Sequence, residues 1–188
     1  MTVPRPEMRG LARIVVVGAT GSGKSTLARQ AAAKLGTAYV ELDELFWAAG
    51  WTQVAPDVFR ARVERATAGS RWVVAGNYSR VRDLLWSRAD TIVWLDYAFP
   101  LVLARLTSRT VRRAVTGEIL WNGNREYFWE HCRLWSEKSL FHWLVKTYWA
   151  YRRELPILFA QPEHAHLRIV PLRRPREAEA WLADLVPE

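Results

Sequence analysis

The sequence is poor in the residues that hold metals and disulfides: it has one cysteine, Cys132, and four histidines among 188 residues. A lone cysteine excludes an internal disulfide and a thiolate metal cluster, and we interpret it as a small buried side chain. The histidines do not have the spacing of metal ligands, so we interpret none as a ligand. These shortages exclude a disulfide-stabilised fold and a zinc-cluster fold.

Long apolar runs are also missing. No stretch is long and apolar enough to cross a bilayer, and residues 1–13 contain no apolar segment of signal-peptide length. We therefore expect a cytoplasmic protein without a membrane partner. Half of the residues are hydrophobic and 24% are charged, which is typical of a globular chain, and the length fits one domain.

Acidic residues are outnumbered by basic ones, 19 against 27, for a net charge of +8. Residues 105–153 hold ten basic and four acidic side chains. A basic surface attracts phosphate groups, which nucleotides, nucleic acids and anionic membranes all carry. Charge alone does not choose among these ligands.

Short apolar runs alternate with helical patterns along the chain. We expect strands at 13–17, 38–42, 71–75, 91–95 and 167–170, and helices at 24–35, 56–68, 78–86, 100–115 and 175–185. This alternation predicts an α/β fold with a parallel sheet covered on both faces. We expect one domain, 1–188, with a core of 13–104 and 154–188 and a basic, aromatic-rich helical lid region of 105–153.

The segment GATGSGKS, residues 18–25, matches the pattern G-x-x-x-x-G-K-[ST] at every fixed position. It follows an expected strand and opens an expected helix, as a phosphate-binding loop must. Glycines let backbone N–H groups turn toward phosphate oxygens, Lys24 reaches the β- and γ-phosphates, and the Ser25 hydroxyl takes a Mg²⁺ position. An ordinary glycine-rich turn is the alternative. We predict ATP and Mg²⁺ as cofactors, with loop contacts from Gly18, Ala19, Thr20, Gly21, Ser22, Gly23, Lys24, Ser25 and Thr26.

Beyond this loop, the chain resembles the small P-loop kinases of the adenylate kinase type. It is most similar to the bacterial DNA topology modulation proteins within that group. The resemblance runs from Val15 to about Leu182 and is carried by GATGSGKST, LDELFW with a following GW, GNYSR, ADTIVWLD and LRRPREAEAWL. It implies a P-loop NTPase three-layer sandwich with a five-stranded parallel sheet in the order 2-3-1-4-5. Ligands would then bind at the carboxyl ends of the strands.

The carboxylates near that edge are unequal candidates. We expect Asp43 at the end of the second strand, where the resemblance implies that it orients or deprotonates the acceptor hydroxyl and supports Mg²⁺ through water. A helix cap is the alternative role for Asp43. We interpret the flanking Glu41 and Glu44 as structural residues.

One position departs from the related sequences, which usually carry Asp where this chain has Ala75. Metal support is therefore expected from Ser25 and Asp43, and the departure puts the catalytic rate in doubt more than nucleotide binding. Asp96, after the fourth strand, is a weaker substitute, and a cap for the helix starting near Pro100 is its alternative role.

Four arginines, Arg105, Arg109, Arg112 and Arg113, share one face of the helix expected at 100–115. They repel each other unless an anion joins them, and arginine binds polyphosphate in a fork geometry. A solvated basic face is the alternative. The resemblance implies that Arg105 stacks on adenine and that Arg109 reaches the phosphates. The catalytic candidates are Lys24, Asp43, Arg109 and Arg113.

The resemblance also implies that Asn77 and Arg80, in GNYSR, face the acceptor beside Asp43. By the same resemblance, Arg173 belongs to a loop that contacts adenine, although Pro175 at a helix start explains part of that pattern without a ligand. Residues 116–124 would be a short lid with glycine hinges.

Ten aromatic residues lie between Trp121 and Tyr151, five of them tryptophan. We interpret them as helices packing on the sheet, and stacking on exposed bases is the alternative. Two sets follow helical spacing: Phe128, Cys132 and Trp135, and then Phe141, Leu144 and Tyr148.

The sequence therefore favours a kinase that moves the γ-phosphate of ATP to a small acceptor, with a nucleoside monophosphate as one candidate. The alternatives are a nucleic-acid-associated ATPase or regulator and a nucleotide-binding protein with little turnover. The expected partners are a nucleotide and a small acceptor, nucleic acid is disfavoured but left open, and the chain is expected to be a monomer or a homodimer.

Overall fold

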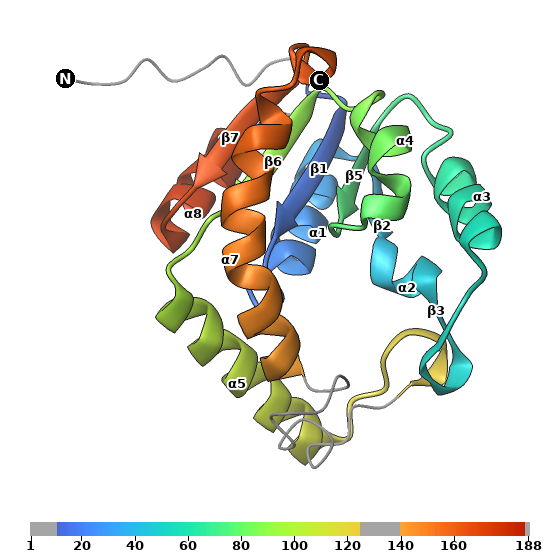
Figure 1. Cartoon of the computed structure of the whole chain (residues 1–188), viewed down its shortest axis with the longest axis vertical. Coiled ribbons are helices and arrows are strands. Elements are labelled where there is room, and N and C mark those ends of the chain that lie inside the picture. The colour runs from blue at the N-terminus through green and yellow to red at the C-terminus, as the bar shows by residue number, and fades with distance from the viewer. Residues whose placement is uncertain (1–10, 125–139, 187–188) are drawn as a thin grey trace.

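The computed structural model describes residues 11–124 and 140–186 and is built on one parallel five-stranded sheet. The strands are β1 (Arg13–Gly18), β2 (Ala38–Glu41), β5 (Trp72–Ala75), β6 (Thr91–Leu95) and β7 (Arg168–Leu172). They lie in the order β2-β5-β1-β6-β7, and every neighbouring pair is parallel (Figure 1). Counted along the chain, this is the expected order 2-3-1-4-5.

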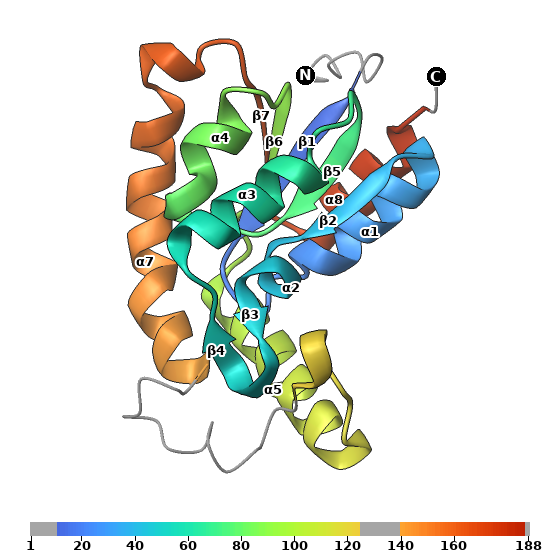
Figure 2. The same ribbon diagram turned by 90° about the vertical axis from the view of Figure 1, so that its right-hand side faces the viewer.

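Helices cover both faces of the sheet, so the predicted three-layer sandwich is confirmed. One face packs against α1 (Lys24–Leu35) and α8 (Pro175–Asp184). The other packs against α3 (Pro56–Ala66), α4 (Arg82–Trp86) and the C-terminal half of α7 (Leu140–Phe159), as Figures 1 and 2 show.

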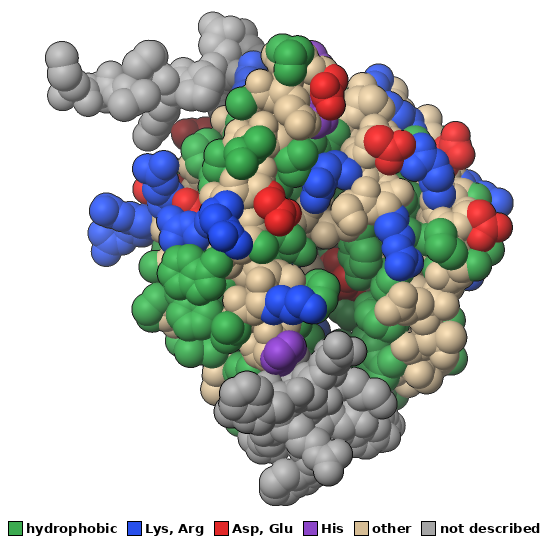
Figure 3. Space-filling model, viewed as in Figure 1, with side chains coloured by type: hydrophobic (Ala, Val, Ile, Leu, Met, Phe, Trp, Pro, Cys, Tyr) green, Lys and Arg blue, Asp and Glu red, His purple; other side chains and the backbone are tan. Residues whose placement is uncertain are grey.

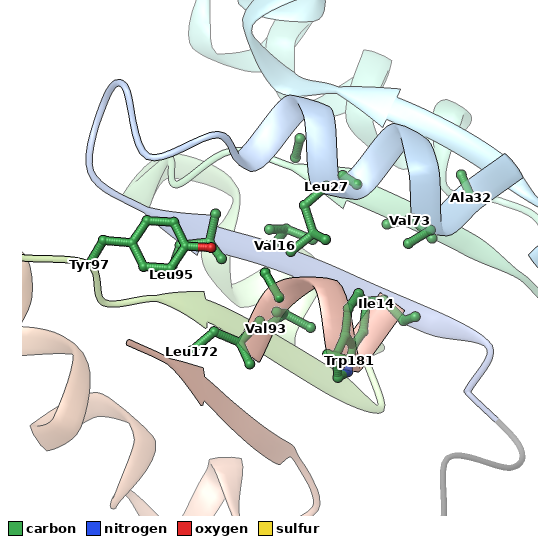
Figure 4. Close-up of a cluster of buried hydrophobic side chains, with 14 of the residues drawn as sticks. Ile14, Val16, Leu27, Ala32, Val73, Val93, Leu95, Tyr97, Leu172 and Trp181 are labelled. Carbon is green, nitrogen blue, oxygen red and sulfur yellow. The ribbon is translucent and has the colours of Figure 1, made fainter. Parts of the chain in front are cut away.

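The alternation of β1 divides the core between these two layers. Ile14 and Val16 face α1 and α8, where they join Leu27 and Trp181 (Figure 4). Val15 and Val17 face the other layer. Residues 14–17 are at most 1% exposed, because a central parallel strand is buried on both faces.

Several short elements stand at the carboxyl edge of the sheet. The strand expected to reach Leu42 stops at Glu41, because Leu42 begins a short helix, α2 (Leu42–Phe46). A small antiparallel hairpin that the sequence analysis did not predict follows, formed by β3 (Trp47–Ala48) and β4 (Thr52–Gln53).

Two longer helices extend past the same edge. α5 (Phe99–Thr116) begins one residue before Pro100 and has Gly117 as its C-cap. α7 extends past residue 153, the end expected for the lid region, as one helix. Leu144 and Tyr148 are buried and Phe141 packs against the same cluster, which confirms the packing expected for this set. The set Phe128, Cys132 and Trp135 lies outside the described residues. In the described ranges, no helix has both the length and the apolar character of a membrane span.

Candidate functional site

The predicted phosphate-binding loop joins β1 to α1 at the carboxyl edge of the sheet. Gly21 and Gly23 have φ of 79° and 97°, conformations that favour glycine. A Cβ at Gly21 would lie 2.8 Å from the Leu106 Cβ of α5, so this position also lacks room for a side chain. Gly23 is the N-cap of α1 and brings no side chain to the helix end, which leaves the first-turn N–H groups for an anion.

Charged groups converge on Lys24. Its Nζ donates to the Ala19 carbonyl oxygen at 2.9 Å. Burial lowers the pKa of Lys24, Asp43 and Glu41 act in the opposite direction, and Arg109 adds to the lowering. Three of the predicted catalytic residues, Lys24, Asp43 and Arg109, therefore interact electrostatically in one place.

Glu41 is a site residue that the sequence analysis treated as structural. It is 4% exposed, and its carboxylate accepts a hydrogen bond from the Tyr39 hydroxyl and interacts with the Ser25 hydroxyl. Burial raises the pKa of Glu41, and Lys24 partly offsets that rise. The side chain thus points to the first turn of α1, beside the predicted metal ligand Ser25.

The sheet register relates Glu41 to Ala75. Ala75 is fully buried and pairs with Glu41 across the β2–β5 ladder. Residues in register on neighbouring parallel strands point to the same face of the sheet. Glu41 therefore presents a carboxylate on the same sheet face as the side chain of Ala75.

Asp43 lies in the first turn of α2, not at the end of β2 as expected. It is also not the helix N-cap, which is Glu41. The Tyr78 hydroxyl donates to Asp43 Oδ1 at 2.5 Å, and burial together with Asp43 raises the pKa of Tyr78. Tyr151 of α7 interacts electrostatically with Asp43 as well. Both tyrosines were missed because each reaches Asp43 from a distant segment.

The other predicted acceptor residues follow β5. Asn77 Nδ2 is buried and has no hydrogen-bond partner, which leaves a donor available to a ligand. Arg80 is exposed, with its guanidinium 5.9 Å from the Phe46 ring of α2. Gly76 lets this loop approach α2 closely, because a Cβ at this position would lie 2.8 Å from the Leu42 Cβ.

The four arginines of α5 divide into two pairs. Arg105 Nη1 donates to the Ser22 carbonyl oxygen at 3.1 Å, and its guanidinium lies 5.1 Å from the Tyr97 ring. Arg105 and Arg109 thus lie beside the phosphate loop. Arg112 and Arg113 lie near Glu118, with nitrogen–oxygen distances of 3.4 and 3.6 Å.

Asp96 does not cap α5, the alternative role considered for it. The N-cap of α5 is Ala98, and Asp96 instead forms an ion pair with Arg152 of α7, Nε to Oδ1, at 2.8 Å. Arg173 Nε lies 3.9 Å from the other Asp96 oxygen. The backbone N–H of Arg173 donates to Glu177 Oε2 at 2.6 Å, so α8 already uses this donor of the predicted adenine loop.

Figure 3 shows a hollow between α7 and α2, with acidic side-chain atoms in its depth. It opens at the carboxyl edge of the sheet, where open α/β sheets bind ligands. The oxygen donors near Lys24, namely Ser25, Glu41 and Asp43, are of the kind that Mg²⁺ prefers. Within the described ranges, no group of three or more His, Cys, Asp or Glu side chains could hold a metal alone. The residues therefore fit a metal that also takes phosphate oxygens and water as ligands.

Solved structures with a similar fold include several small kinases. A gluconokinase from Sinorhizobium meliloti superposes with a TM-score of 0.51 at 22% identity, covering 95% of each chain. A shikimate kinase from Acinetobacter baumannii, solved with shikimate, has a TM-score of 0.52 at 19% identity, covering 95% of this chain and 93% of its own. The chain has the fold of the small P-loop kinases.

At these low sequence identities, the likeness shows the fold alone. A second shikimate kinase, from Bacteroides thetaiotaomicron, gives a TM-score of 0.52 at 16% identity, with 94% and 97% of the two chains covered. No protein-family model and no curated protein sequence matches the chain. These structures support a small P-loop kinase and do not support the resemblance to topology modulation proteins.

Proposed function

We propose that the protein is an ATP- and Mg²⁺-dependent kinase that transfers the γ-phosphate to a hydroxyl group of a small acceptor. The observation that carries this proposal is the convergence of Lys24, Arg109, Glu41 and Asp43 beside a phosphate loop of the correct geometry. Cations and carboxylates together serve a charged donor and a hydroxyl nucleophile, whereas a binding loop alone needs only the cations.

Each residue then has a distinct task. The loop backbone and Lys24 bind the phosphates, and Lys24 with Arg109 stabilises the charge on the transferred group. Mg²⁺, when bound, neutralises charge on the β- and γ-phosphate oxygens, and Ser25 with Glu41 and Asp43 would hold it directly or through water. The acceptor oxygen bonds to the γ-phosphorus while the bond to the bridging oxygen breaks, Asp43 takes the hydroxyl proton, and ADP leaves.

The acceptor would bind between α2, the loop after β5 and α7. Asn77 offers a buried donor, Tyr78 and Tyr151 flank Asp43, and Arg80 lies at the exposed rim. Amides, hydroxyls and a cation suit a polar acceptor that carries an anionic group, which includes nucleoside monophosphates and hydroxy acids.

Acceptor-dependent ADP release tests the proposal. Wild-type protein and Asp43→Asn are assayed with ATP, Mg²⁺ and a panel of nucleoside monophosphates, sugar acids and other hydroxy acids. We expect one acceptor class to accelerate ADP release in the wild type and Asp43→Asn to lose that acceleration. ATP binding without any acceptor-dependent release would favour the nucleotide-binding protein with little turnover.

A further inference from the structure

The segment 117–124, in the predicted lid, contacts α2 through one asparagine side chain. Asn122 Nδ2 donates to the carbonyl oxygens of Glu44 and Trp47, at 3.1 and 2.6 Å. These carbonyls lie at the C-terminal end of α2, where a helix leaves such groups without partners of its own. Asn122 therefore caps the short helix whose first turn carries Asp43.

A second asparagine binds the β3–β4 hairpin. Asn124 Nδ2 donates to the Ala48 carbonyl oxygen at 2.9 Å, and Asn124 Oδ1 accepts from the Trp51 N–H at 2.8 Å. The same Nδ2 also donates to the Trp121 carbonyl oxygen at 2.9 Å, inside its own segment. Asn124 is 3% exposed. One buried amide thus joins both sides of the hairpin turn to the lid segment.

Backbone conformation marks this contact as one that the surrounding structure enforces. Asn122 and Trp51 have φ of 56° and 54°, and among the described residues they are the non-glycine ones with positive φ. This region is unfavourable for residues with a Cβ and persists where other contacts hold it. The two residues lie on opposite sides of the contact. The ring centroids of Trp51 and Trp121 are 6.4 Å apart.

The lid segment is also connected to the phosphate loop. Glu118 pairs with Arg112 and Arg113 of α5, and Arg105 of the same helix bonds the Ser22 carbonyl. Contacts therefore run from the phosphate loop through α5 and segment 117–124 to α2. Figures 1 and 2 both show this segment beside the hairpin.

We propose that Asn122 and Asn124 are positioning residues: by docking segment 117–124 onto α2 and the hairpin, they set Asp43 and link the acceptor side to the nucleotide side. The catalytic role of Asp43 in this inference rests on the proposed function, whereas the docking of segment 117–124 does not. If nucleotide orders the phosphate loop and α5, the asparagines should transmit that order to residues 42–53.

Hydrogen–deuterium exchange with mass spectrometry tests this link, with and without a non-hydrolysable ATP analogue and Mg²⁺. Asn122→Asp keeps the side-chain size but loses the amide donor. Asn122→Gly suits the positive φ and removes the side chain, so it separates backbone strain from hydrogen bonding. Gln53→Ala, an exposed change on the same hairpin, is the matched control.

In the wild type and Gln53→Ala, the analogue should slow exchange in both 18–26 and 42–53. In both Asn122 variants, 42–53 should exchange at least about tenfold faster even without nucleotide, the equivalent of about 1.4 kcal/mol of lost local stability. The analogue should still protect 18–26 there but not 42–53. Asn124→Ala should give the same exchange pattern as the Asn122 variants. If this buried substitution unfolds the chain, the variants of the exposed Asn122 still test the proposal.

Unchanged exchange of 42–53 in both Asn122 variants would overturn the proposal, as would protection of 42–53 by nucleotide in those variants. The two hypotheses fail differently. A wild type whose residues 18–26 gain no protection from the analogue contradicts nucleotide binding, while the nucleotide-free exchange of 42–53 still decides whether the asparagines hold α2.

Discussion

In the proposed site, the nucleotide half takes most of its chemistry from consecutive residues of the phosphate loop and α1, to which α5 adds Arg105 and Arg109. The acceptor half (α2, the β3–β4 hairpin and the loop after β5) assembles its chemistry from distant segments. In the first, glycine conformations and the start of α1 point backbone donors at one place. In the second, Asp43 depends on Tyr78, Tyr151 and the asparagine contacts.

This difference teaches how specificity is distributed over the fold. Phosphates are the same in every nucleoside triphosphate, so a backbone cradle recognises them and one contiguous motif encodes it. An acceptor is recognised by individual side chains, which the tertiary structure brings together. Mutations should therefore separate the two halves, and the following predictions run from the largest expected effect to the smallest.

Lys24→Ala should have the largest effect on turnover. Removing an electrostatic stabiliser of the transferred phosphate is expected to reduce acceptor-dependent ADP release by about 10²–10³-fold or more. Lys34→Ala, on the same helix, is the matched control, because Lys34 donates to the carbonyl oxygens of Leu182 and Ala183 at the surface, away from the phosphate loop. Equal rates for the two variants would remove Lys24 from the reaction.

Asp43→Asn should reduce the same rate by at least about a hundredfold, the low end for losing a general base. Nucleotide affinity, measured by titration calorimetry, should change little, since the loop backbone, Lys24, Ser25 and Glu41 remain to bind the phosphates and Mg²⁺. Glu44→Gln, an exposed neighbouring change, should keep wild-type turnover. If Asp43→Asn also lost nucleotide affinity, the division into halves would be wrong at this residue.

Glu41→Gln should lower turnover by about 10–100-fold, as expected for a residue supporting a metal ligand. The stability of Glu41→Gln relative to wild type should instead increase as the pH rises. Burial raises the pKa of Glu41, so the folded state holds this proton more tightly, and stability falls as pH rises between the unfolded and folded pKa values. The melting temperature of Glu41→Gln minus that of wild type should thus increase as the pH rises above about 4.5, the ordinary pKa of a glutamate. A difference in melting temperature that does not change with pH would mean that burial does not disfavour the charged form of Glu41.

Ala75→Asp tests the exchange of carboxylates across the ladder. Because Glu41 already occupies this face, the single change should lower the free energy of unfolding by about 3 kcal/mol or more, the cost of an uncompensated buried charge. In the Glu41→Ala background the added aspartate should instead recover part of the lost turnover. Greater turnover for Ala75→Asp alone would show that Glu41 does not do the work assigned to it.

Nucleic-acid binding should show the smallest effect. Trp143 and Trp149 of α7 are 46% and 55% exposed, but Trp149 already packs against Phe99 and Tyr148, and base stacking on single strands uses a basic groove with several aromatic platforms. Single-stranded DNA should bind with a dissociation constant of about 10⁻⁴–10⁻⁶ M at physiological salt and far more weakly as salt rises. Nanomolar, salt-resistant binding that Trp149→Ala abolishes would favour the nucleic-acid hypothesis.

Most of the fold was predictable because strands and helices leave periodic patterns. The run Ile14–Val17 predicted a buried strand. The strand order was predicted from the family resemblance, and the structure has that order. Short elements without a period escaped, which is why α2 and the hairpin were missed and Asp43 was assigned to a strand. The position of Glu41 beside Ser25 was not predicted for a related reason: Ser25 belongs to another element, and sequence spacing carries no record of that contact.

Titration calorimetry with ATP and Mg²⁺ tests the central claim most directly. The account predicts that one nucleotide binds per chain, that Lys24→Ala abolishes or strongly weakens binding, and that Asp43→Asn changes the affinity little. No binding by the wild type, or equal affinities for wild type and Lys24→Ala, would contradict the account.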